Sequence, residues 1–293
     1  MTAMQSTAPY RDLFYTSQDG LRLFAKDFGE RTSKQVPAIC LPGLTRNSKD
    51  FEALASHLSA TRRVLCPDLR GRGRSQYCES WSDYTPQNEM LDVLDLMGAA
   101  GIHQAAFIGT SRGGIVTMLL AAQRPNAVRG AVLNDIGPEV SIDGLKRIAG
   151  YAGAMEAPAT WTEAAFKLRM MNERDFPTLT SDDWYEQARR TFAEEGGVPK
   201  IDYDAKIGTA LRKGLEAANG ALPDMWPQFK ALGHAPALVI RGENSDILSA
   251  ETMQRMEKQH PKITGVTVKD RGHVPFLDEA EALTAIDTFF ATL

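Results

Sequence analysis

The feature that most constrains the fold is the segment 109–114, GTSRGG, which lies between an apolar run at 105–108 and a helix-like run at 115–123. A G-x-S-x-G sequence between a strand and a helix is typical of a sharp turn that exposes a serine hydroxyl at the end of a sheet. Glycines beside the serine allow the backbone segments to approach one another closely. We therefore take Ser111 as the candidate nucleophile.

Strand-like and helix-like patterns alternate along most of the chain. Residues 11–28 alternate around Asp19-Gly20 and predict a hairpin. The further predicted strands are 38–41, 63–66, 105–108, 128–133, 237–241 and 263–268, and the predicted core helices are 48–58, 86–99, 115–123 and 279–292. Such alternation predicts an α/β fold with a mostly parallel, doubly wound sheet.

The pattern changes after Gly137-Pro138. Helix-like periodicity covers 143–154, 161–173, 181–195 and 204–218, with almost no strand-like run. We therefore expect residues 139–227 to form a helical cap inserted into one domain, whose core comprises 1–138 and 228–293. Among the aromatic residues of this cap, Trp161, Trp184 and Tyr203 are candidates for the wall of a substrate pocket.

A serine hydroxyl needs a general base to act as a nucleophile. Of the five histidines, His273 lies in a glycine-containing loop between the last predicted strand and the last helix. We expect His273 to be the base and the other four, at 57, 103, 234 and 260, to be surface or cap residues.

The base needs a carboxylate that orients its ring. The loop after the strand at 238–240 contains Asp246, which we choose as the acid, and Glu243, which remains a competitor. The backbone amides of Leu44 and Arg112 are the expected oxyanion donors, because Leu44 follows Gly43 in an early turn and Arg112 follows the nucleophile. The Arg112 side chain either contacts a substrate carboxylate or forms an ion pair, with Asp135 or Glu139 as expected partners.

Five stretches, LPGLTRNSKDF, PDLRGRGRS, GTSRGG, RGENSD and DRGHVPF, resemble the α/β-hydrolase superfamily in its capped esterase, lactonase and carbon–carbon hydrolase branch. The resemblance implies an eight-stranded sheet, a triad of Ser111, Asp246 and His273, no cofactor and a site between core and cap. Two departures are Pro42 in place of the usual histidine of the oxyanion turn, and an acid loop one residue longer than usual.

These features predict a serine hydrolase that cleaves an ester or lactone of a small to medium molecule. The alternatives are a carbon–carbon hydrolase of dienoate-type diketones and a non-catalytic small-molecule receptor. Because dehalogenases and epoxide hydrolases of this fold use an aspartate nucleophile, Ser111 disfavours both.

The composition of the chain limits the kinds of binding partner that we expect. The net charge of −4 and pI near 5.8 give no reason to expect binding to nucleic acid or to an anionic membrane. The three cysteines lack C-x-x-C spacing, so we expect no metal site and no disulfide, with Cys40 and Cys66 buried as small apolar residues. The polar start of the chain and the absence of a long apolar run predict a cytoplasmic protein. A homo-oligomer stays open, because the sequence does not specify the oligomeric state.

Overall fold

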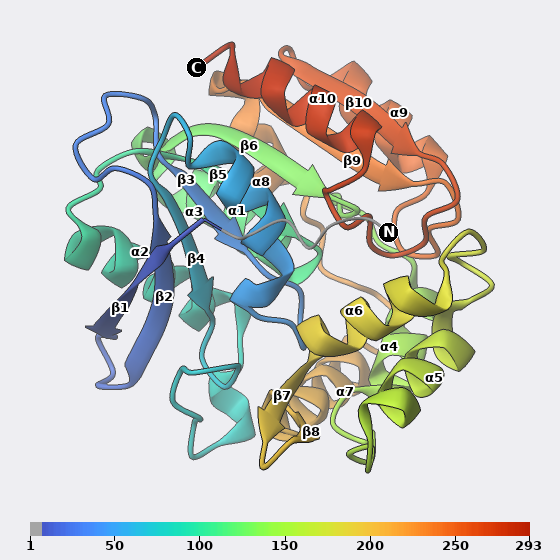
Figure 1. Ribbon diagram of the computed structural model, residues 1–293. Coiled ribbons are helices and arrows are strands. Elements are labelled where there is room, and N and C mark those ends of the chain that lie inside the picture. Colours follow the sequence, from blue (N-terminus) through green and yellow to red (C-terminus); the bar gives the residue numbers. More distant parts are fainter. Residues whose placement is uncertain (1–7) are drawn as a thin grey trace.

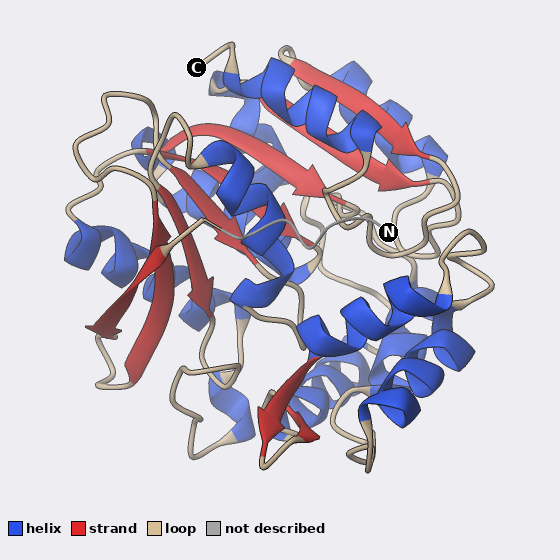
Figure 2. Cartoon of the chain, in the orientation of Figure 1, coloured by secondary structure: helices blue, strands red, loops and turns tan. Residues whose placement is uncertain are grey.

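The computed structural model describes residues 8–293 and contains an eight-stranded sheet with helices on both faces (Figures 1 and 2). The strands are β1 (Tyr10–Thr16), β2 (Arg22–Phe28), β3 (Ala38–Leu41), β4 (Val64–Asp68), β5 (Ala105–Thr110), β6 (Val128–Asn134), β9 (Ala237–Gly242) and β10 (Ile263–Val268). Their order is β1-β2-β4-β3-β5-β6-β9-β10. β1 pairs antiparallel with β2 and β2 with β4, whereas the strands from β4 to β10 run parallel. The predicted fold class is confirmed.

Alternate residues of the central strands enter two cores. In β4, Leu65 faces one core while Val64 and Cys66 face the other, as the two-residue period of a strand requires. One core lies under α2 (Pro86–Ala100), α3 (Arg112–Gln123), α8 (Trp226–Lys230) and α9 (Ala250–Gln259). The other lies under α1 (Glu52–Leu58) and α10 (Ala280–Phe290).

Local signals set the ends of these helices. The Thr85 hydroxyl accepts a hydrogen bond from the Asn88 amide at the start of α2, and Pro86 occupies the first helical position. Gly101 ends that helix in the left-handed conformation, with φ of 67°. The first turn of the predicted helix 48–58 is a 3-10 turn (Ser48–Phe51), which Asn47 caps.

Residues 142–218, which lie between β6 and β9 in the chain, form a separate layer across the ends toward which the parallel strands point (Figure 1). Its helices are α4 (Ile142–Tyr151), α5 (Trp161–Asn172), α6 (Ser181–Thr191) and α7 (Lys206–Ala218), close to the four predicted helices. A hairpin of β7 (Phe192–Glu195) and β8 (Val198–Ile201) is also present. The helical prediction for 192–195 was therefore wrong, because Gly196 and Gly197, both at positive φ, turn the chain there. The division into domains stays a prediction; below, "cap" means α4 to α7 with this hairpin.

Backbone hydrogen bonds join the cap to the loop after β4. The amide of Gly73 donates to the carbonyl of Asp202 at 2.9 Å, and the amide of Asp204 donates to the carbonyl of Gly71 at 2.8 Å. The Tyr84 hydroxyl adds a hydrogen bond to the Asp204 carboxylate at 2.7 Å. The cap is thereby held beside the carboxyl end of β4.

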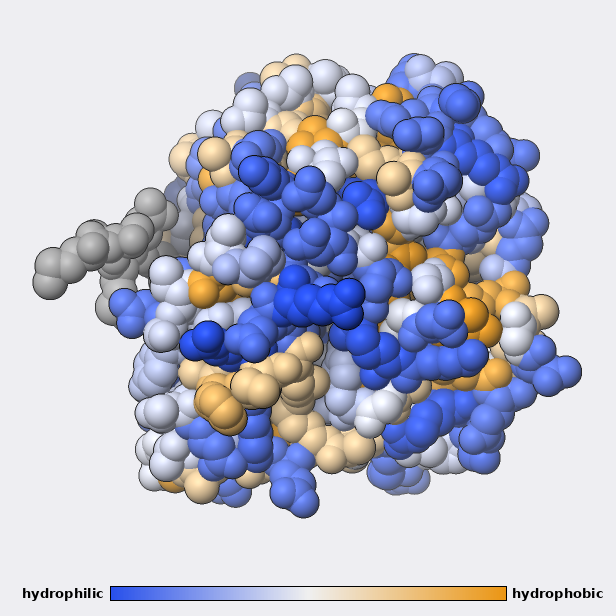
Figure 3. Space-filling model, turned by 90° about the vertical axis from the view of Figure 1, so that its right-hand side faces the viewer, coloured by the Kyte–Doolittle hydropathy of each residue, from blue (hydrophilic) through white to orange (hydrophobic). Residues whose placement is uncertain are grey.

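Hydrophilic side chains predominate on the face shown in Figure 3, where hydrophobic ones gather in separate smaller areas. Within residues 8–293, no helix is both long and apolar enough to cross a membrane. The cysteines of these residues are free and buried, and Cys40 and Cys66 lie in the sheet as predicted. The polar start of the chain, on which the prediction of a cytoplasmic location depends, lies largely in residues 1–7, outside the described part of the chain.

Candidate active site

Ser111 occupies the turn between β5 and α3. Its φ of 50° and ψ of −113° are sparsely populated for a residue with a side chain, and strain of this kind is typical of functional turns. The turn needs glycine at Gly113, because a Cβ there would overlap the carbonyl group of Leu41 in β3. This close approach of helix and strand places the Ser111 hydroxyl at the carboxyl end of the sheet, as the sequence predicted.

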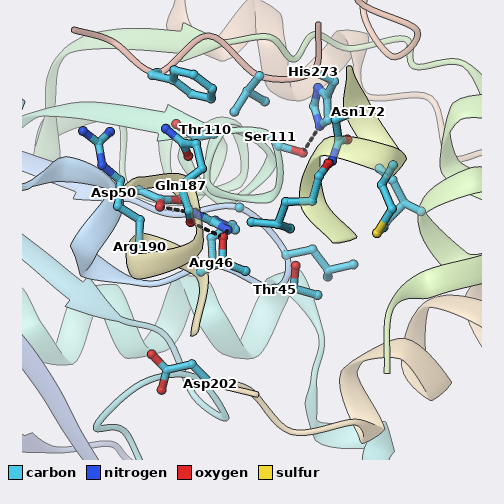
Figure 4. Close-up of a pocket in the computed structure, with 18 of the residues that line it drawn as sticks. Thr45, Arg46, Asp50, Thr110, Ser111, Asn172, Gln187, Arg190, Asp202 and His273 are labelled. Carbon is cyan, nitrogen blue, oxygen red and sulfur yellow. Dashed lines mark hydrogen bonds and ion pairs between the residues drawn. The ribbon is translucent and has the colours of Figure 1, made fainter. Parts of the chain in front are cut away.

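His273 lies in the loop between β10 and α10 and reaches the nucleophile. Its Nε2 atom is 2.9 Å from the hydroxyl oxygen of Ser111 (Figure 4). The imidazole is 7% exposed, so bulk water has little access to it. The predicted pairing of Ser111 with His273 is present, although the two residues are 162 positions apart.

The carboxylate on the other side of the imidazole belongs to Asp135. Its Oδ2 atom is 2.7 Å from Nδ1 of His273, and its side chain is fully buried. The Gly242 amide donates to Oδ1 at 2.8 Å, and the Ser245 hydroxyl donates to Oδ2 at 2.5 Å. Asp135 comes directly after β6 with φ of 53°, a left-handed conformation that aspartate tolerates better than most residues.

The prediction that Asp246 orients His273 was therefore wrong. The Asp246 carboxylate instead accepts two hydrogen bonds from Arg147 of α4, at 2.6 and 2.8 Å. Burial raises the pKa of Asp246, but Arg147 outweighs that effect and the pKa lies below its ordinary value. The competitor Glu243 is exposed and accepts a hydrogen bond from the Asp270 amide, away from the imidazole.

A signal for Asp135 was present in the sequence. Asp135 lies two residues after the predicted strand 128–133, and it satisfies the order serine, acid, histidine as well as Asp246 does. The segment around Asp246 still contributes to the site, because Gly242 at the end of β9 and Ser245 in the following loop bind the Asp135 carboxylate.

The turn after β3 faces the nucleophile. A Cβ built on Gly43 would lie 3.9 Å from Cβ of Ser111, and Leu44 lines the same cavity as Ser111. Arg112 is the first residue of α3, so its amide belongs to the free N-terminal turn of that helix. Both predicted oxyanion donors are thus close to Ser111 along the chain or in space.

The side chain of Arg112 forms an ion pair, but not with either expected partner. Its Nε atom is 2.6 Å from the Glu89 carboxylate of α2. Asp135 is bound to His273, and Glu139 pairs with Arg255 at 2.5 Å. Arg112 is absent from the lining of the cavity above Ser111.

A cavity of about 190 Å³ opens above Ser111 and His273. Side chains from every cap helix except α7 line it, together with the hairpin. Most of the contributing side chains are apolar, among them Ile148, Leu168 and Phe176. Trp184 and Tyr203 line the cavity as predicted.

Trp161 does not line this cavity, so its prediction as a pocket residue was wrong. Its indole nitrogen donates to the Gly197 carbonyl at 3.1 Å, and the guanidinium carbon of Arg189 lies 3.8 Å from the centre of its ring. These contacts hold Trp161 against the hairpin, where it is half-buried.

One side of the cavity is polar. Figure 4 shows Arg46 directed at Asp50, with Gln187 and Arg190 of α6 nearby. Burial lowers the pKa of Arg46, but Asp50 outweighs it and the pKa lies above its ordinary value. Arg190 is bound more loosely, since its terminal nitrogens lie 3.3 and 3.4 Å from one oxygen of Asp278.

The remaining histidines lie away from the nucleophile. His57 is 2.7 Å from Asp287 on the surface, and His234 contacts backbone carbonyls. Among the described residues, no group of three or more histidine, cysteine, aspartate or glutamate side chains is arranged to hold a metal ion.

Comparisons with known proteins agree with this fold. Residues 38–286 match the model of the "Alpha/beta hydrolase family", and the chain belongs to that family. It is 31% identical over 274 residues to 3-hydroxybutyrate-oligomer hydrolase of Cupriavidus necator, covering 92% of each chain. It is 25% identical to 2-(acetamidomethylene)succinate hydrolase of Mesorhizobium japonicum, covering 79% of each. An α/β hydrolase structure from Novosphingobium aromaticivorans matches with a TM-score of 0.90 and 43% identity, over 98% of this chain and all of the other.

Proposed function

We propose that this protein is a serine hydrolase that cleaves carboxylic esters through an acyl-enzyme on Ser111. The observation that carries the proposal is the chain of hydrogen bonds from Ser111 through His273 to Asp135, at 2.9 and 2.7 Å. A nucleophile bound to a base, which is in turn bound to an acid, is the arrangement required for acyl transfer by serine.

In the proposed mechanism, the Ser111 oxygen attacks the ester carbonyl carbon while Nε2 of His273 takes its proton. The carbonyl oxygen becomes an oxyanion, which the amides of Leu44 and Arg112 stabilise. Asp135 stabilises the imidazolium and holds Nδ1 in place. His273 then gives the proton to the departing alkoxide, so that an alcohol leaves and the acyl-enzyme remains. A water molecule, deprotonated by His273, attacks the acyl-enzyme and releases the acid and free Ser111.

For the substrate we propose a short ester of a hydroxy acid. The apolar part of the cavity suits a short alkyl chain, and the polar side with Gln187 and Arg190 suits a hydroxyl or carboxylate end. Similarity to a hydrolase of 3-hydroxybutyrate oligomers supports this choice, because ester bonds join the units of such an oligomer. The cytoplasmic location and small-molecule partner predicted from sequence belong to the same proposal.

The two alternatives have less support. The carbon–carbon hydrolase hypothesis uses the same triad and gave Arg112 as a group that could help to bind a substrate carboxylate. The Arg112 side chain is instead paired with Glu89. A receptor that only binds a ligand has no need of an acid-oriented base against a serine, whereas His273 is held between Asp135 and Ser111.

The test compares wild type with Ser111→Ala on p-nitrophenyl esters of increasing acyl length and on the linear dimer of 3-hydroxybutyrate. Wild type should hydrolyse short acyl esters and the dimer, and the variant should lose turnover with an unchanged circular dichroism spectrum. A fluorophosphonate probe should label wild type at Ser111 and leave the variant unlabelled. Turnover that persists in Ser111→Ala would overturn the proposal, and a wild type that takes no label would favour the receptor.

A further inference from the structure

A chain of buried charged residues lies directly behind the nucleophile. Glu89 of α2 is fully buried and lies between Arg72, in the loop after β4, and Arg112, at the start of α3. Its Oε2 atom is 2.6 Å from Nε of Arg112, and its Oε1 atom is 2.8 Å from Nη1 of Arg72. Arg72 is fully buried and Arg112 is 14% exposed. One carboxylate thus joins two arginines from different elements.

Both arginines that bind Glu89 are connected to the candidate oxyanion donors. The Nε atom of Arg72 donates to the backbone carbonyl of Leu44 at 2.8 Å. That hydrogen bond fixes the peptide that follows Leu44, and with it the turn that carries the candidate Leu44 amide. At the other end, Arg112 itself carries the second candidate amide, and its Nη2 atom also donates to the Tyr84 carbonyl at 3.1 Å.

The charge arrangement keeps Glu89 ionised. Burial raises the pKa of Glu89, but Arg112 and Arg72 outweigh burial and hold the pKa below its ordinary value. A buried ion pair adds little net stability compared with well-packed apolar side chains, so stability alone does not account for three such residues at this place. Catalysis by an oxyanion hole depends on donors held within tenths of an ångström, which a rigid buried network can provide.

We propose that Arg72, Glu89 and Arg112 form a positioning network that keeps the Leu44 turn and the first turn of α3 at the separation the oxyanion requires. The three side chains touch no substrate and act through the backbone that they hold. The inference rests on the proposed function, since it assigns these amides to the oxyanion of the ester reaction.

A neighbouring ion pair offers a matched control. Arg70 belongs to the same loop as Arg72, and Asp92 lies one turn after Glu89 on α2. The two side chains are 2% and 1% exposed, with Nη2 of Arg70 2.6 Å from Oδ1 of Asp92. The Arg70 side chain also contacts Asp19, and its backbone carbonyl accepts a hydrogen bond from Nη1 of Arg72 at 2.6 Å. In the hydrogen bonds of the described residues, neither side chain of the Arg70–Asp92 pair contacts Leu44, Glu89 or Arg112. Breaking the Arg70–Asp92 pair disturbs the loop after β4 and α2, but it removes no side chain that contacts Leu44 or Arg112.

The experiment compares Glu89→Gln with Asp92→Asn at a temperature where circular dichroism shows both to be folded. Glu89→Gln should lower kcat for a p-nitrophenyl ester by about ten- to a hundredfold, with KM changed less than about threefold. Asp92→Asn should leave kcat within about threefold of wild type. Equal losses of kcat in both variants, or a rise in KM alone for Glu89→Gln, would overturn the proposal.

Arg72→Lys provides a second variant should Glu89→Gln not fold. It keeps the positive charge, but a single ammonium group cannot reproduce the planar fork that serves both Leu44 and Glu89. The same fall in kcat is expected, and an unchanged kcat in this variant contradicts the network.

The rate of Ser111 labelling by a fluorophosphonate separates the two proposals, since the phosphoryl oxygen of this probe uses the same amides. A wild type that neither takes the label nor hydrolyses esters contradicts the proposed function. Rapid labelling of wild type with slower labelling of Glu89→Gln supports the network. Equal labelling rates in the two proteins contradict the network alone.

Discussion

Asp135 and His273 are 138 positions apart in the sequence, yet Oδ2 of Asp135 lies 2.7 Å from Nδ1 of His273. The acid therefore follows β6, whereas Asp246, after β9, is turned toward Arg147 of the cap. Two carboxylates near one histidine thus have different partners, and this difference can be tested directly.

Replacing Asp135 by Asn should lower kcat by about 10⁴-fold, because the amide cannot stabilise the imidazolium or select the correct tautomer of His273. Asp246→Asn should cost less than about tenfold, since it weakens a half-exposed contact between core and cap. Steady-state kinetics on one ester measure both. A larger loss in Asp246→Asn than in Asp135→Asn would return the catalytic role to Asp246.

Ser245→Ala should lower kcat by about tenfold to a hundredfold, because the Ser245 hydroxyl donates to Asp135 at 2.5 Å and hydrogen bonds to a charged group contribute about 1.5 to 3 kcal/mol. The same hydroxyl accepts from the amides of Ile247 and Leu248, so the variant should also unfold at a lower temperature. Ser245→Thr, which retains a hydroxyl, should recover part of kcat. A loss of stability without any loss of kcat would show that Ser245 does not act on Asp135.

Gly113→Ala should destabilise the protein by about 1 to 3 kcal/mol or more, because its Cβ would overlap the Leu41 carbonyl and neither backbone segment can move freely. Gly214, in the middle of α7, has no atom within 4 Å of a built Cβ. Gly214→Ala should instead stabilise the protein by about 0.5 to 1 kcal/mol through its higher helix propensity. Denaturant unfolding measures the free energy of unfolding of the two variants. If the turn at Ser111 could relax, Gly113→Ala would not be destabilised.

Glu89→Gln should change how stability depends on pH. The pKa of Glu89 is held below its ordinary value in the folded protein, so the unfolded chain binds more protons in acid. The stability that ionised Glu89 provides is therefore present above its unfolded pKa of about 4.3, and it is lost as the pH falls through the folded pKa. We expect wild type to be more stable than the variant by about 3 to 5 kcal/mol at neutral pH, and the gap to narrow in acid. Urea unfolding between about pH 6 and 3 measures the difference in free energy of unfolding between wild type and Glu89→Gln. A difference that does not change with pH contradicts the role of the Glu89 charge.

The ion pairs of the three arginines after β4 could not be predicted from the sequence. Arg70, Arg72 and Arg74 each pair with a carboxylate. Their partners Asp92, Glu89 and Asp12 lie on α2 and β1, and no local pattern in the sequence specifies which carboxylate each arginine meets.

The sequence was enough to predict the strands of the main sheet, most of the helices, the turn at Ser111 and the role of His273, because short-range patterns of apolar residues, glycine and loop length specify each of them. The tertiary structure was needed to identify which carboxylate binds His273, which one binds Arg112 and which aromatic residues face the cavity. The physical reason is that parallel strands bring their carboxyl ends to one edge of the sheet, so several acids are candidates at once. The choice between Asp135 and Asp246 then depends on the backbone turn at each residue and on Arg147, which lies far from both His273 and Asp246 in the chain.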